Sequence, residues 1–249
     1  MKGVTQKNYD MYRSDKGLPR QSVQRISDAE LQDIYKTRYW DLVKGDELPS
    51  GVDYAVFDGA VNSGPGQSIK WLQRALAPVY QGRADGIIGP ATLAALDAWV
   101  DYDDLIDRML KLRMAFLRAL KGWGTFGRGW TSRVNNVKQA AQAMATGSVG
   151  PGPVYVPGGD TKGYIQDAKT APSTAPGDVM TGGGSAGAVI TQTVNQLTPL
   201  SNFASVAYII TALTVAGALI AVGGIVWRSW AQRKNSELQN ALGLMPDEN

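Results

Sequence analysis

The sequence contains neither cysteine nor histidine. The lack of cysteine excludes disulfide bonds and thiol nucleophiles, and the lack of histidine also excludes Ser-His-Asp triads and the usual Cys/His zinc sites. A hydrolase of this composition has to rely on carboxylates or on a cofactor. Aspartate is plentiful, but the only glutamates are Glu30, Glu47, Glu237 and Glu248. We expect neither a bound metal ion nor an organic cofactor.

The sequence also lacks a strong charge of one sign and a hydrophobic run near residue 1. The formal net charge is only +3 in 249 residues. No dense basic stripe is present, so we expect no nucleic-acid partner. The first ten residues contain no apolar stretch of the kind that a cleavable signal peptide requires.

A strongly apolar stretch, Val52–Leu76, is the expected centre of the fold. A helix that is apolar on nearly all sides is typically buried. Asp58, Asn62 and Ser63 give this helix one polar edge, and buried polar groups need partners. Gly64 and Pro65 can end this helix and begin the next. The residues expected at the centre of the core are Val56, Phe57, Ala60 and Val61.

Helices are predicted on both sides of this stretch, and the first 146 residues are expected to be nearly all helical. Thr5 is a suitable N-cap, and Ser27 with Glu30 fits a capping box that gives Glu30 a structural role. A glycine- and aromatic-rich segment, Gly122–Trp130, is expected to be a loop before the last helix of this region. The other predicted helices span residues 5–18, 28–40, 92–99, 101–120 and 131–145.

Composition changes after residue 146. Residues 147–202 are rich in glycine, proline, threonine, serine and alanine, which predicts a flexible linker. Residues 203–227 then form a run of 25 residues without a charge. At 1.5 Å per residue this run extends about 37 Å as a helix, enough to cross a hydrocarbon core of about 30 Å. We expect one transmembrane helix at 203–227 and a short polar tail at 228–249.

The flanks of the apolar run bear on its orientation. Trp227 and Trp230 fit an interfacial belt, and Arg228 begins a basic segment, so the tail is expected in the cytoplasm. The helical domain is then expected to face the periplasm from the inner membrane, although no signal sequence begins its export. The lipid bilayer is therefore an expected partner. Small residues at Ala212, Ala216, Gly217 and Ala221 would also permit a weak helix–helix dimer.

Several ordered motifs resemble glycoside hydrolase family 108, the lysozyme-like muramidases with a C-terminal predicted peptidoglycan-binding region. The matching stretches are Lys2–Gln6, Ile34–Tyr35, Tyr39–Trp40, Asp53–Asp58, Val61–Pro65, Asp85–Gly86, Gly89–Pro90, Gly129–Trp130 and Arg133–Val134. The resemblance covers residues 1 to about 145 and implies a lysozyme-like helical domain at 1–146, with the peptidoglycan-binding-like part at about 50–146. Together with the flexible linker and the one C-terminal transmembrane helix that composition predicts, the expected architecture is mainly α.

In the family that these motifs resemble, the catalytic glutamate lies in a Glu-Gly-Gly motif upstream of the Gly-Val-Thr segment. In this chain that segment is Gly3-Val4-Thr5, so the resemblance assigns no catalytic residue within residues 1–249. Glu30 and Glu47 match neither the position nor the context of the family's glutamate. We expect the start of the protein to lie upstream, or the chain to be a degenerate lytic enzyme with little activity.

Seven residues are candidates for binding the glycan. Thr5 and Gln6 follow the segment in which the family carries its acid, and the polar edge of the central helix supplies three more. Two tryptophans could stack on sugar rings, with core packing as the equal alternative. For Asp58 an internal hydrogen-bonding role is the stronger interpretation. The candidates are Thr5, Gln6, Asp58, Asn62, Ser63, Trp123 and Trp130.

Three functions remain open from the sequence. The first is a membrane-anchored peptidoglycan hydrolase of phage or prophage type, an endolysin-like N-acetylmuramidase that cleaves the glycan strand by carboxyl acid catalysis. The second is a non-catalytic, membrane-tethered peptidoglycan-binding protein. The third and weakest is a holin-like role of the transmembrane segment itself.

Overall fold

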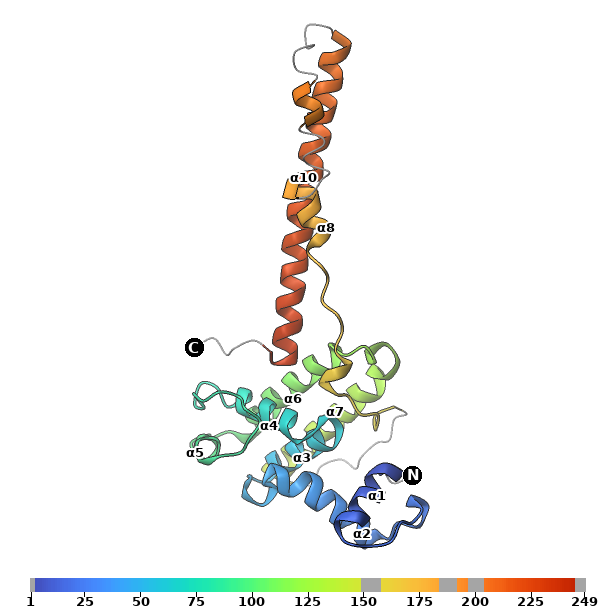
Figure 1. Ribbon diagram of the computed structural model, residues 1–249. Coiled ribbons are helices and arrows are strands. Elements are labelled where there is room, and N and C mark those ends of the chain that lie inside the picture. Colours follow the sequence, from blue (N-terminus) through green and yellow to red (C-terminus); the bar gives the residue numbers. More distant parts are fainter. Residues whose placement is uncertain (1–2, 149–157, 184–191, 197–203, 245–249) are drawn as a thin grey trace. The chain divides into compact units, whose positions relative to one another are not determined.

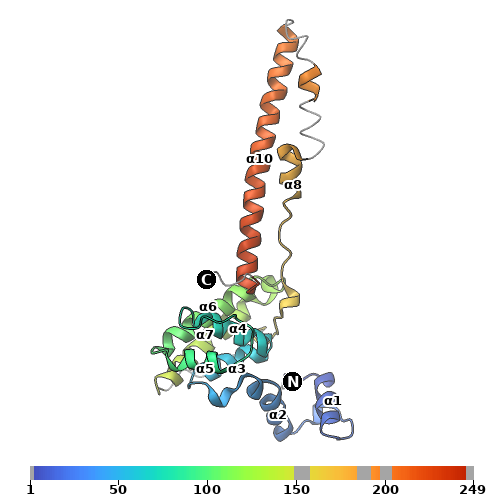
Figure 2. The same ribbon diagram turned by 60° about the vertical axis from the view of Figure 1, so that its left-hand side comes forward.

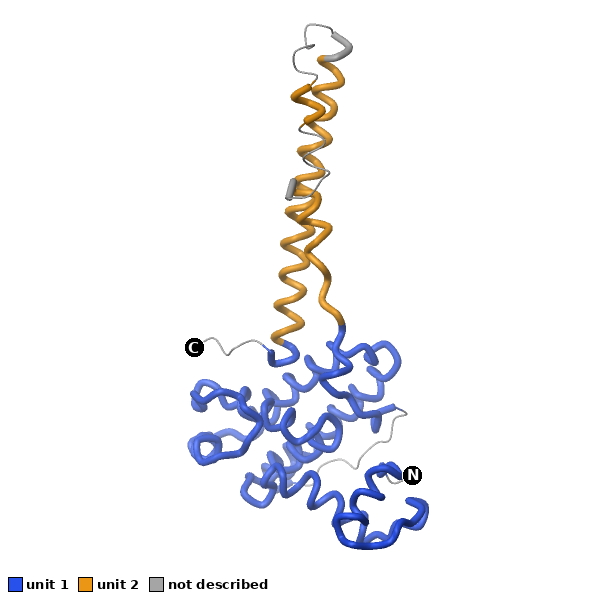
Figure 3. The backbone as a smooth tube through the Cα atoms, in the orientation of Figure 1, with its two compact units in different colours: residues 1–169, 241–249 blue, residues 170–240 orange. Residues whose placement is uncertain are grey.

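A computed structural model describes residues 3–148, 158–183, 192–196 and 204–244. It confirms the mainly α class: these residues contain no strand, and only an isolated bridge joins Leu120 to Ala168. The chain divides into two units (Figure 3). The first comprises Met1–Lys169 with Ala241–Asn249, and the second comprises Thr170–Asn240.

Figure 1 labels the helices and colours them by their position in the sequence. The α-helices of the first unit are α1 (Gln6–Asp15), α2 (Asp28–Tyr35), α3 (Val52–Ser63), α4 (Pro65–Ala75), α5 (Pro90–Asp97), α6 (Tyr102–Arg118) and α7 (Trp123–Ala145). Its short helical turns are η1 (Val23–Arg25), η2 (Lys36–Trp40), η3 (Asp41–Val43), η4 (Gly45–Glu47) and η5 (Ile165–Asp167). Farther along the chain come α8 (Ala175–Asp178), η6 (Val179–Gly183) and α10 (Ala204–Leu242).

The expected helix starts of the N-terminal region are confirmed. The Thr5 hydroxyl caps α1 by accepting a hydrogen bond from the Asn8 backbone N–H at 3.3 Å. Ser27 and Glu30 form the capping box of α2. Pro65 begins α4 directly after Gly64, whose φ of 97° is open to glycine at little cost.

The core of the first unit lies around α3, which packs against α4, α6 and α7. Val56 and Ala60 are fully buried as predicted, but Phe57 and Val61 are only half-buried. The expectation for Phe57 and Val61 was therefore wrong. Phe57 packs edge-on against the rings of Tyr35 and Trp40, at 6.3 and 5.6 Å between centroids. One side of α3 thus meets a partly exposed aromatic layer, because η2 covers it incompletely.

The segment predicted as a loop at Gly122–Trp130 is largely helical, because α7 begins at Trp123. Glycine inside a helix costs about 1 kcal/mol relative to alanine, which made a loop the natural expectation. Packing outweighs this cost here. The Trp123 ring lies so close to Gly127 that a Cβ there would come within 2.9 Å of its atoms. Gly129 and Trp130 are buried on the same helix.

The region predicted as a flexible linker contains a packed segment. Residues 158–169, here called the strap, lie against the first unit. Lys121 N donates to Asp167 O at 2.8 Å, and Lys169 N donates to Ala119 O at 2.9 Å. The linker expectation fails at these residues because their backbone groups pair with the helical unit. Residues 149–157, also assigned to the linker, lie outside the described residues.

In the second unit, α10 is a continuous helix of 39 residues, and α8 lies beside it in Figures 1 and 2. Among the described residues, Ala207–Leu242 is the one helix long and apolar enough to cross a membrane, and an 18-residue window within it has a mean hydropathy of 2.4. The predicted polar tail is helical as far as Leu242, and the predicted first residue of the span, Phe203, lies outside the described part. Trp227 Nε1 donates to Ser173 O at 3.1 Å, and Asp178 pairs with Arg228 at 3.5 Å.

Candidate functional site

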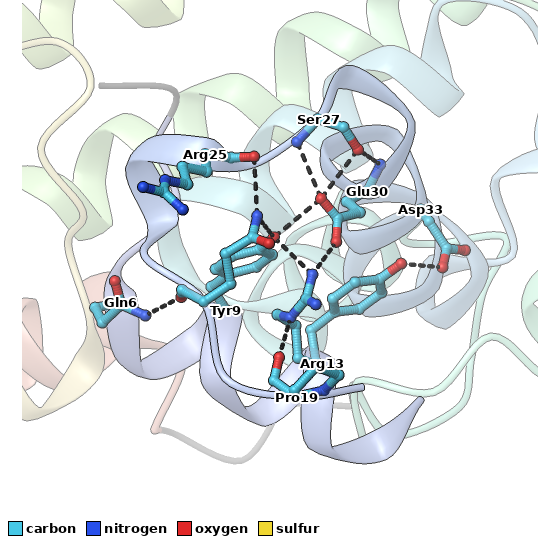
Figure 4. A network of polar contacts seen from close by, with 10 residues as sticks. Gln6, Tyr9, Arg13, Pro19, Arg25, Ser27, Glu30 and Asp33 are labelled. Carbon is cyan, nitrogen blue, oxygen red and sulfur yellow. Dashed lines mark hydrogen bonds and ion pairs between the residues drawn. The ribbon is translucent and has the colours of Figure 1, made fainter. Parts of the chain in front are cut away.

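Glu30 is at the centre of a polar network that joins α1 to α2 (Figure 4). Its carboxylate accepts hydrogen bonds from the Tyr9 hydroxyl at 2.9 Å and from Arg13 Nη1 at 2.6 Å. The backbone N–H of Ser27 donates to it at 3.0 Å and lowers the pKa of Glu30, an effect to which Tyr9 and Arg13 also contribute. Glu30 therefore has the structural role that the capping box indicated.

Two of the predicted glycan-binding residues, Thr5 and Gln6, lie on this N-terminal pair of helices. Thr5 is occupied as the cap of α1. The Gln6 side chain donates to Asp10 Oδ1 at 2.7 Å and to Gln21 O at 2.8 Å, and it accepts from the Val23 N–H at 2.7 Å. Its donors and its acceptor are thus engaged within the hairpin. No described contact joins Thr5 or Gln6 to the other candidates.

Asp58 connects three helices of the core. It extends from α3 and is held by Arg113 of α6 and Arg133 of α7. Arg133 contacts both carboxylate oxygens, through Nε at 3.0 and 3.1 Å and through Nη2 at 2.6 Å. Arg113 Nη1 lies 2.7 Å from Asp58 Oδ1 while the Arg113 side chain is 0% exposed. The geometry gives Asp58 the internal hydrogen-bonding role considered from the sequence.

Burial and charge act on Asp58 in opposite directions. Burial alone would raise the pKa of its carboxyl group, but the charges of Arg113 and Arg133 outweigh burial and lower the pKa below its usual value. A general acid that works near neutral pH needs a raised pKa instead. Asp58 and Glu30 are both shifted the opposite way, so both are suited to structure or binding rather than to proton donation.

Asn62, Ser63 and Trp130 come together under the strap. Asn62 Nδ2 donates to Thr161 O at 2.9 Å, and Trp130 Nε1 donates to the same oxygen at 2.6 Å. Ser63 donates its hydroxyl to Asn62 Oδ1 at 3.3 Å. Asn62, Ser63 and Trp130 are 1%, 6% and 2% exposed. They form one polar cluster, and the strap covers it.

The cluster is bordered by tyrosines and by a lysine of the strap. Lys162 Nζ donates to the Tyr39 hydroxyl at 3.0 Å and lies 5.3 Å from the centre of the Tyr39 ring. The Tyr39 ring packs against Tyr35 at 5.8 Å between centroids. Burial raises the pKa of both Tyr35 and Tyr54. A tyrosine hydroxyl is neutral at physiological pH even at its usual pKa of about 10, so these groups are able to donate hydrogen bonds there.

Trp123 lies at the edge of this region. Its ring is 6.4 Å from that of Trp130, and the Arg118 guanidinium lies 5.8 Å from the centre of the Trp123 ring. A shallow surface pocket passes along α7 beside it, lined among others by Arg128, Ser132 and Asn135. Trp123 is thus more accessible than Trp130, whose ring is buried in the core.

Sequence reasoning missed Arg113, the functional partner of Asp58, and the strap residues Thr161 and Lys162. A signal for Arg113 was present, because it lies on the apolar stripe of α6, four residues after Met109 and four before Leu117. A charged residue on such a stripe needs a buried partner. No comparable signal marked the strap, whose contacts are made mainly by backbone groups.

Comparison with known proteins supports two consecutive modules. A family described as "Glycosyl hydrolase 108" matches residues 1–64, and one described as "Predicted Peptidoglycan domain" matches residues 67–135. The solved structure of SagA from Brucella abortus is similar, with 36% sequence identity and a TM-score of 0.50. The similarity covers 57% of this chain and 79% of that chain. No curated protein matches the chain.

Proposed function

Because this chain belongs to the glycosyl hydrolase 108 family, we propose that it acts on peptidoglycan as an N-acetylmuramidase that cleaves the glycan strand. The observation that carries the proposal is the pairing of a glycoside hydrolase segment with a peptidoglycan domain directly after it.

The proposed chemistry is protonation of the glycosidic oxygen by a glutamic acid as the sugar acquires oxocarbenium character. We propose that this acid lies in a Glu-Gly-Gly segment before Gly3, as in the family that the chain resembles. Residues 3–169 then supply the substrate-binding part of the enzyme. The engagement of Glu30 by Arg13 and of Asp58 by two arginines supports this division of roles.

Purified cell-wall sacculi test the enzymatic proposal. We expect the in-frame DNA upstream of Met1 to encode a Glu-Gly-Gly segment, and we expect the protein extended through it to release reducing sugar ends. The matched control replaces the glutamate of that segment by glutamine and should be inactive. Residues 1–202 alone should release little. Sacculi that stay intact with the extended protein would contradict the muramidase proposal.

A non-catalytic peptidoglycan-binding protein is the second candidate. The match to a peptidoglycan domain, together with the structural engagement of Glu30 and Asp58, favours it. Co-sedimentation with sacculi separates the two proposals. Binding without release of sugar ends, by the extended protein as well as by the shorter one, would support the binding protein.

We further propose that α10 anchors the protein in the inner membrane with residues before 203 facing the periplasm. The length and hydropathy of Ala207–Leu242 and the basic residues after Trp227 support this. In the second unit, however, Gly177 packs against Gly224, and Asp178 pairs with Arg228. A single crossing puts Asp178 and Arg228 on opposite sides of the bilayer, so these contacts would have to open on insertion.

Paired cysteines test this orientation without background, since the chain has no cysteine of its own. We expect Asp178→Cys with Arg228→Cys to crosslink in the soluble protein and not after insertion into vesicles. Arg228→Cys with Gln232→Cys is the control, because residues four apart on a helix stay close in both states. A crosslink between positions 178 and 228 that persists in vesicles would show the proposed orientation to be wrong.

A further inference from the structure

The strap contacts the helices of its own unit largely through its backbone amide groups. The side chain of Asn62 donates to the carbonyl of Thr161, and the carbonyl of Asn62 accepts the N–H of Gly163 at 3.1 Å. Asn62 thus pairs with the two backbone amides that flank Lys162. Trp130 Nε1 donates a second hydrogen bond to the Thr161 carbonyl. The recognised group is the peptide backbone on both sides of Lys162.

Lys162, the residue between these two amides, has its own contacts with the first unit. The Lys162 ammonium donates to the Tyr39 hydroxyl and lies over the Tyr39 ring. An ammonium over an aromatic face is attracted by the ring quadrupole. Two residues before Thr161, the carbonyl of Gly159 accepts a hydrogen bond from Arg133 Nη1 at 3.4 Å. The receiving side chains therefore contact two backbone amides, one cationic side chain and one further backbone carbonyl of the strap.

The receiving residues and the occupant come from different parts of the chain. Tyr39 and Asn62 lie within the residues that match the glycoside hydrolase family, and Trp130 and Arg133 lie within the peptidoglycan domain. The strap follows both matched ranges. If the strap left, Asn62 and Trp130 would lose their hydrogen bonds to Thr161, and their donor groups would be open to water or to a ligand.

We propose that Asn62, Trp130, Arg133 and Tyr39 form a binding site for a peptide with a cationic side chain, and that the strap occupies this site in place of the peptide. Peptidoglycan carries such peptides: its stem peptides contain a diamino acid with an amine at the end of its side chain. Identifying the ligand as a stem peptide rests on the proposed function. The strap then acts as an intramolecular competitor, and its release opens the site.

Gly163 gives a way to release the strap without altering the site. A Cβ at this position would come within 2.7 Å of a Leu120 methyl group and 3.1 Å of a Leu117 methyl group. Gly163→Val should therefore prevent the strap from seating. Gln166→Val is the matched control, because Gln166 is exposed on the same strap. Hydrogen–deuterium exchange across residues 158–169 reports whether the strap has left, and thermal melting reports whether the protein is folded.

Binding is measured with three probes. They are a synthetic stem pentapeptide with lysine at its third position, the same peptide with alanine there, and a tetramer of N-acetylglucosamine. The tetramer supplies amides without a peptide, so it separates recognition of acetamido groups from recognition of the stem. If the strap holds the site closed nine-tenths of the time, removing it strengthens the apparent affinity about tenfold.

The expected result is that Gly163→Val binds the lysine peptide at least about tenfold more tightly than the unchanged chain, whereas Gln166→Val does not. The alanine peptide and the sugar tetramer should show no such gain. Lys162→Met keeps a bulky side chain at this position but removes the ammonium that contacts Tyr39, so it should give a smaller gain in the same direction. It serves as the second variant if Gly163→Val does not fold.

The proposal is overturned if neither variant gains affinity for the lysine peptide, or if the sugar tetramer gains as much as the peptide. Sacculi distinguish this failure from failure of the proposed function. An unchanged chain that binds or cuts sacculi while neither variant gains peptide affinity leaves the proposed function standing. Variants that bind the peptide while the extended protein ignores sacculi would instead refute the proposed function.

Discussion

Glu30 and Asp58 are both held by arginine, but their partners lie at very different distances along the chain. Tyr9 and Arg13 lie 21 and 17 residues from Glu30, whereas Arg133 lies 75 residues from Asp58. The Arg13 and Glu30 side chains are 9% and 18% exposed, and the Arg113 and Asp58 side chains are 0% and 11% exposed. The first network closes a hairpin of two helices, and the second joins α3, α6 and α7.

The comparison indicates that an arginine–carboxylate pair contributes differently to the free energy of unfolding in the two networks. An ion pair near the surface is partly screened by water and contributes little. A buried pair becomes strongly destabilising when one partner is removed, because the other charge remains without compensation. In the described part of the chain, Nε, Nη1 and Nη2 of Arg113 are buried without a hydrogen-bond partner, and the charge of Arg113 is compensated by its ion pair with Asp58, 2.7 Å from Nη1. Arg113 therefore depends on Asp58.

The largest expected effect is that of Asp58→Ala. Because this change leaves Arg113 buried without its counter-charge, we expect a loss of about 3–5 kcal/mol in the free energy of unfolding. Urea unfolding of residues 1–169, followed by far-UV circular dichroism, measures it. The matched change in the hairpin, Glu30→Ala, should cost only about 1–2 kcal/mol, through the lost cap and hydrogen bonds. Equal losses in the two variants would contradict the comparison.

Acid should weaken the Asp58 network next. The pKa of Asp58 is lower in the folded protein than in the unfolded chain, where aspartate titrates near pH ~3.9. Its contribution to stability is therefore present above about pH 4 and is lost as the pH falls further, towards the folded-state pKa. Unfolding free energies between pH 3 and pH 6 measure this loss. The slope should be shallower in Asp58→Asn, and an unchanged slope would assign it to other carboxylates.

Within the hairpin, Tyr9→Phe should have a moderate effect. The Tyr9 hydroxyl donates to Glu30 and accepts from Arg13 at 3.1 Å while Tyr9 is 0% exposed. We expect a loss of about 1 kcal/mol, no larger than that of Glu30→Ala, because the Glu30 carboxylate loses one of its hydrogen bonds and keeps the others. Trp99→Phe serves as the control, since the Trp99 indole donates to Asp101 O at an exposed position. A loss no larger than that of the control would show that the network is not cooperative.

The smallest effect is expected from alkali at Tyr12. Burial, together with its hydrogen bond to Asp33, raises the pKa of Tyr12 to about 12. Neutral Tyr12 thus contributes stability that is fully present below the unfolded-state pKa of about 10 and is lost as the pH rises towards 12. Asp33 is one-third exposed, so the loss should be small. The difference in unfolding free energy between the unchanged chain and Tyr12→Phe, measured from pH 9 to pH 11.5, should shrink with pH.

Sequence reasoning succeeded where the signal was local. The Thr5 cap, the Ser27–Glu30 capping box and the Gly64–Pro65 boundary each depend on residues a few positions apart, and all three are present. It failed for the start of α7, because the contact of the Trp123 ring with Gly127 decides the conformation there. Propensity counts only the cost of glycine and cannot see that contact.

The candidate site divides in the same way. The polar edge of α3 was recognised, because the four-residue spacing of Asp58 and Asn62 puts both on one face. Their partners were not identified. Arg113 and Arg133 belong to other helices, and the strap binds Asn62 through its backbone. A backbone carbonyl carries no side-chain signature, so composition alone predicted a flexible linker at the strap.

By itself the sequence determined the helical class, the apolar run within α10, the exclusion of thiol and imidazole chemistry, and the polar edge of the central helix. These properties follow from composition and from periodicity over a few turns. Only the tertiary structure decided that Asp58 is bound between two arginines and that Asn62 and Trp130 lie beneath the strap. The reason is physical: the pKa and accessibility of a polar group depend on the charges and backbone groups that the fold brings beside it.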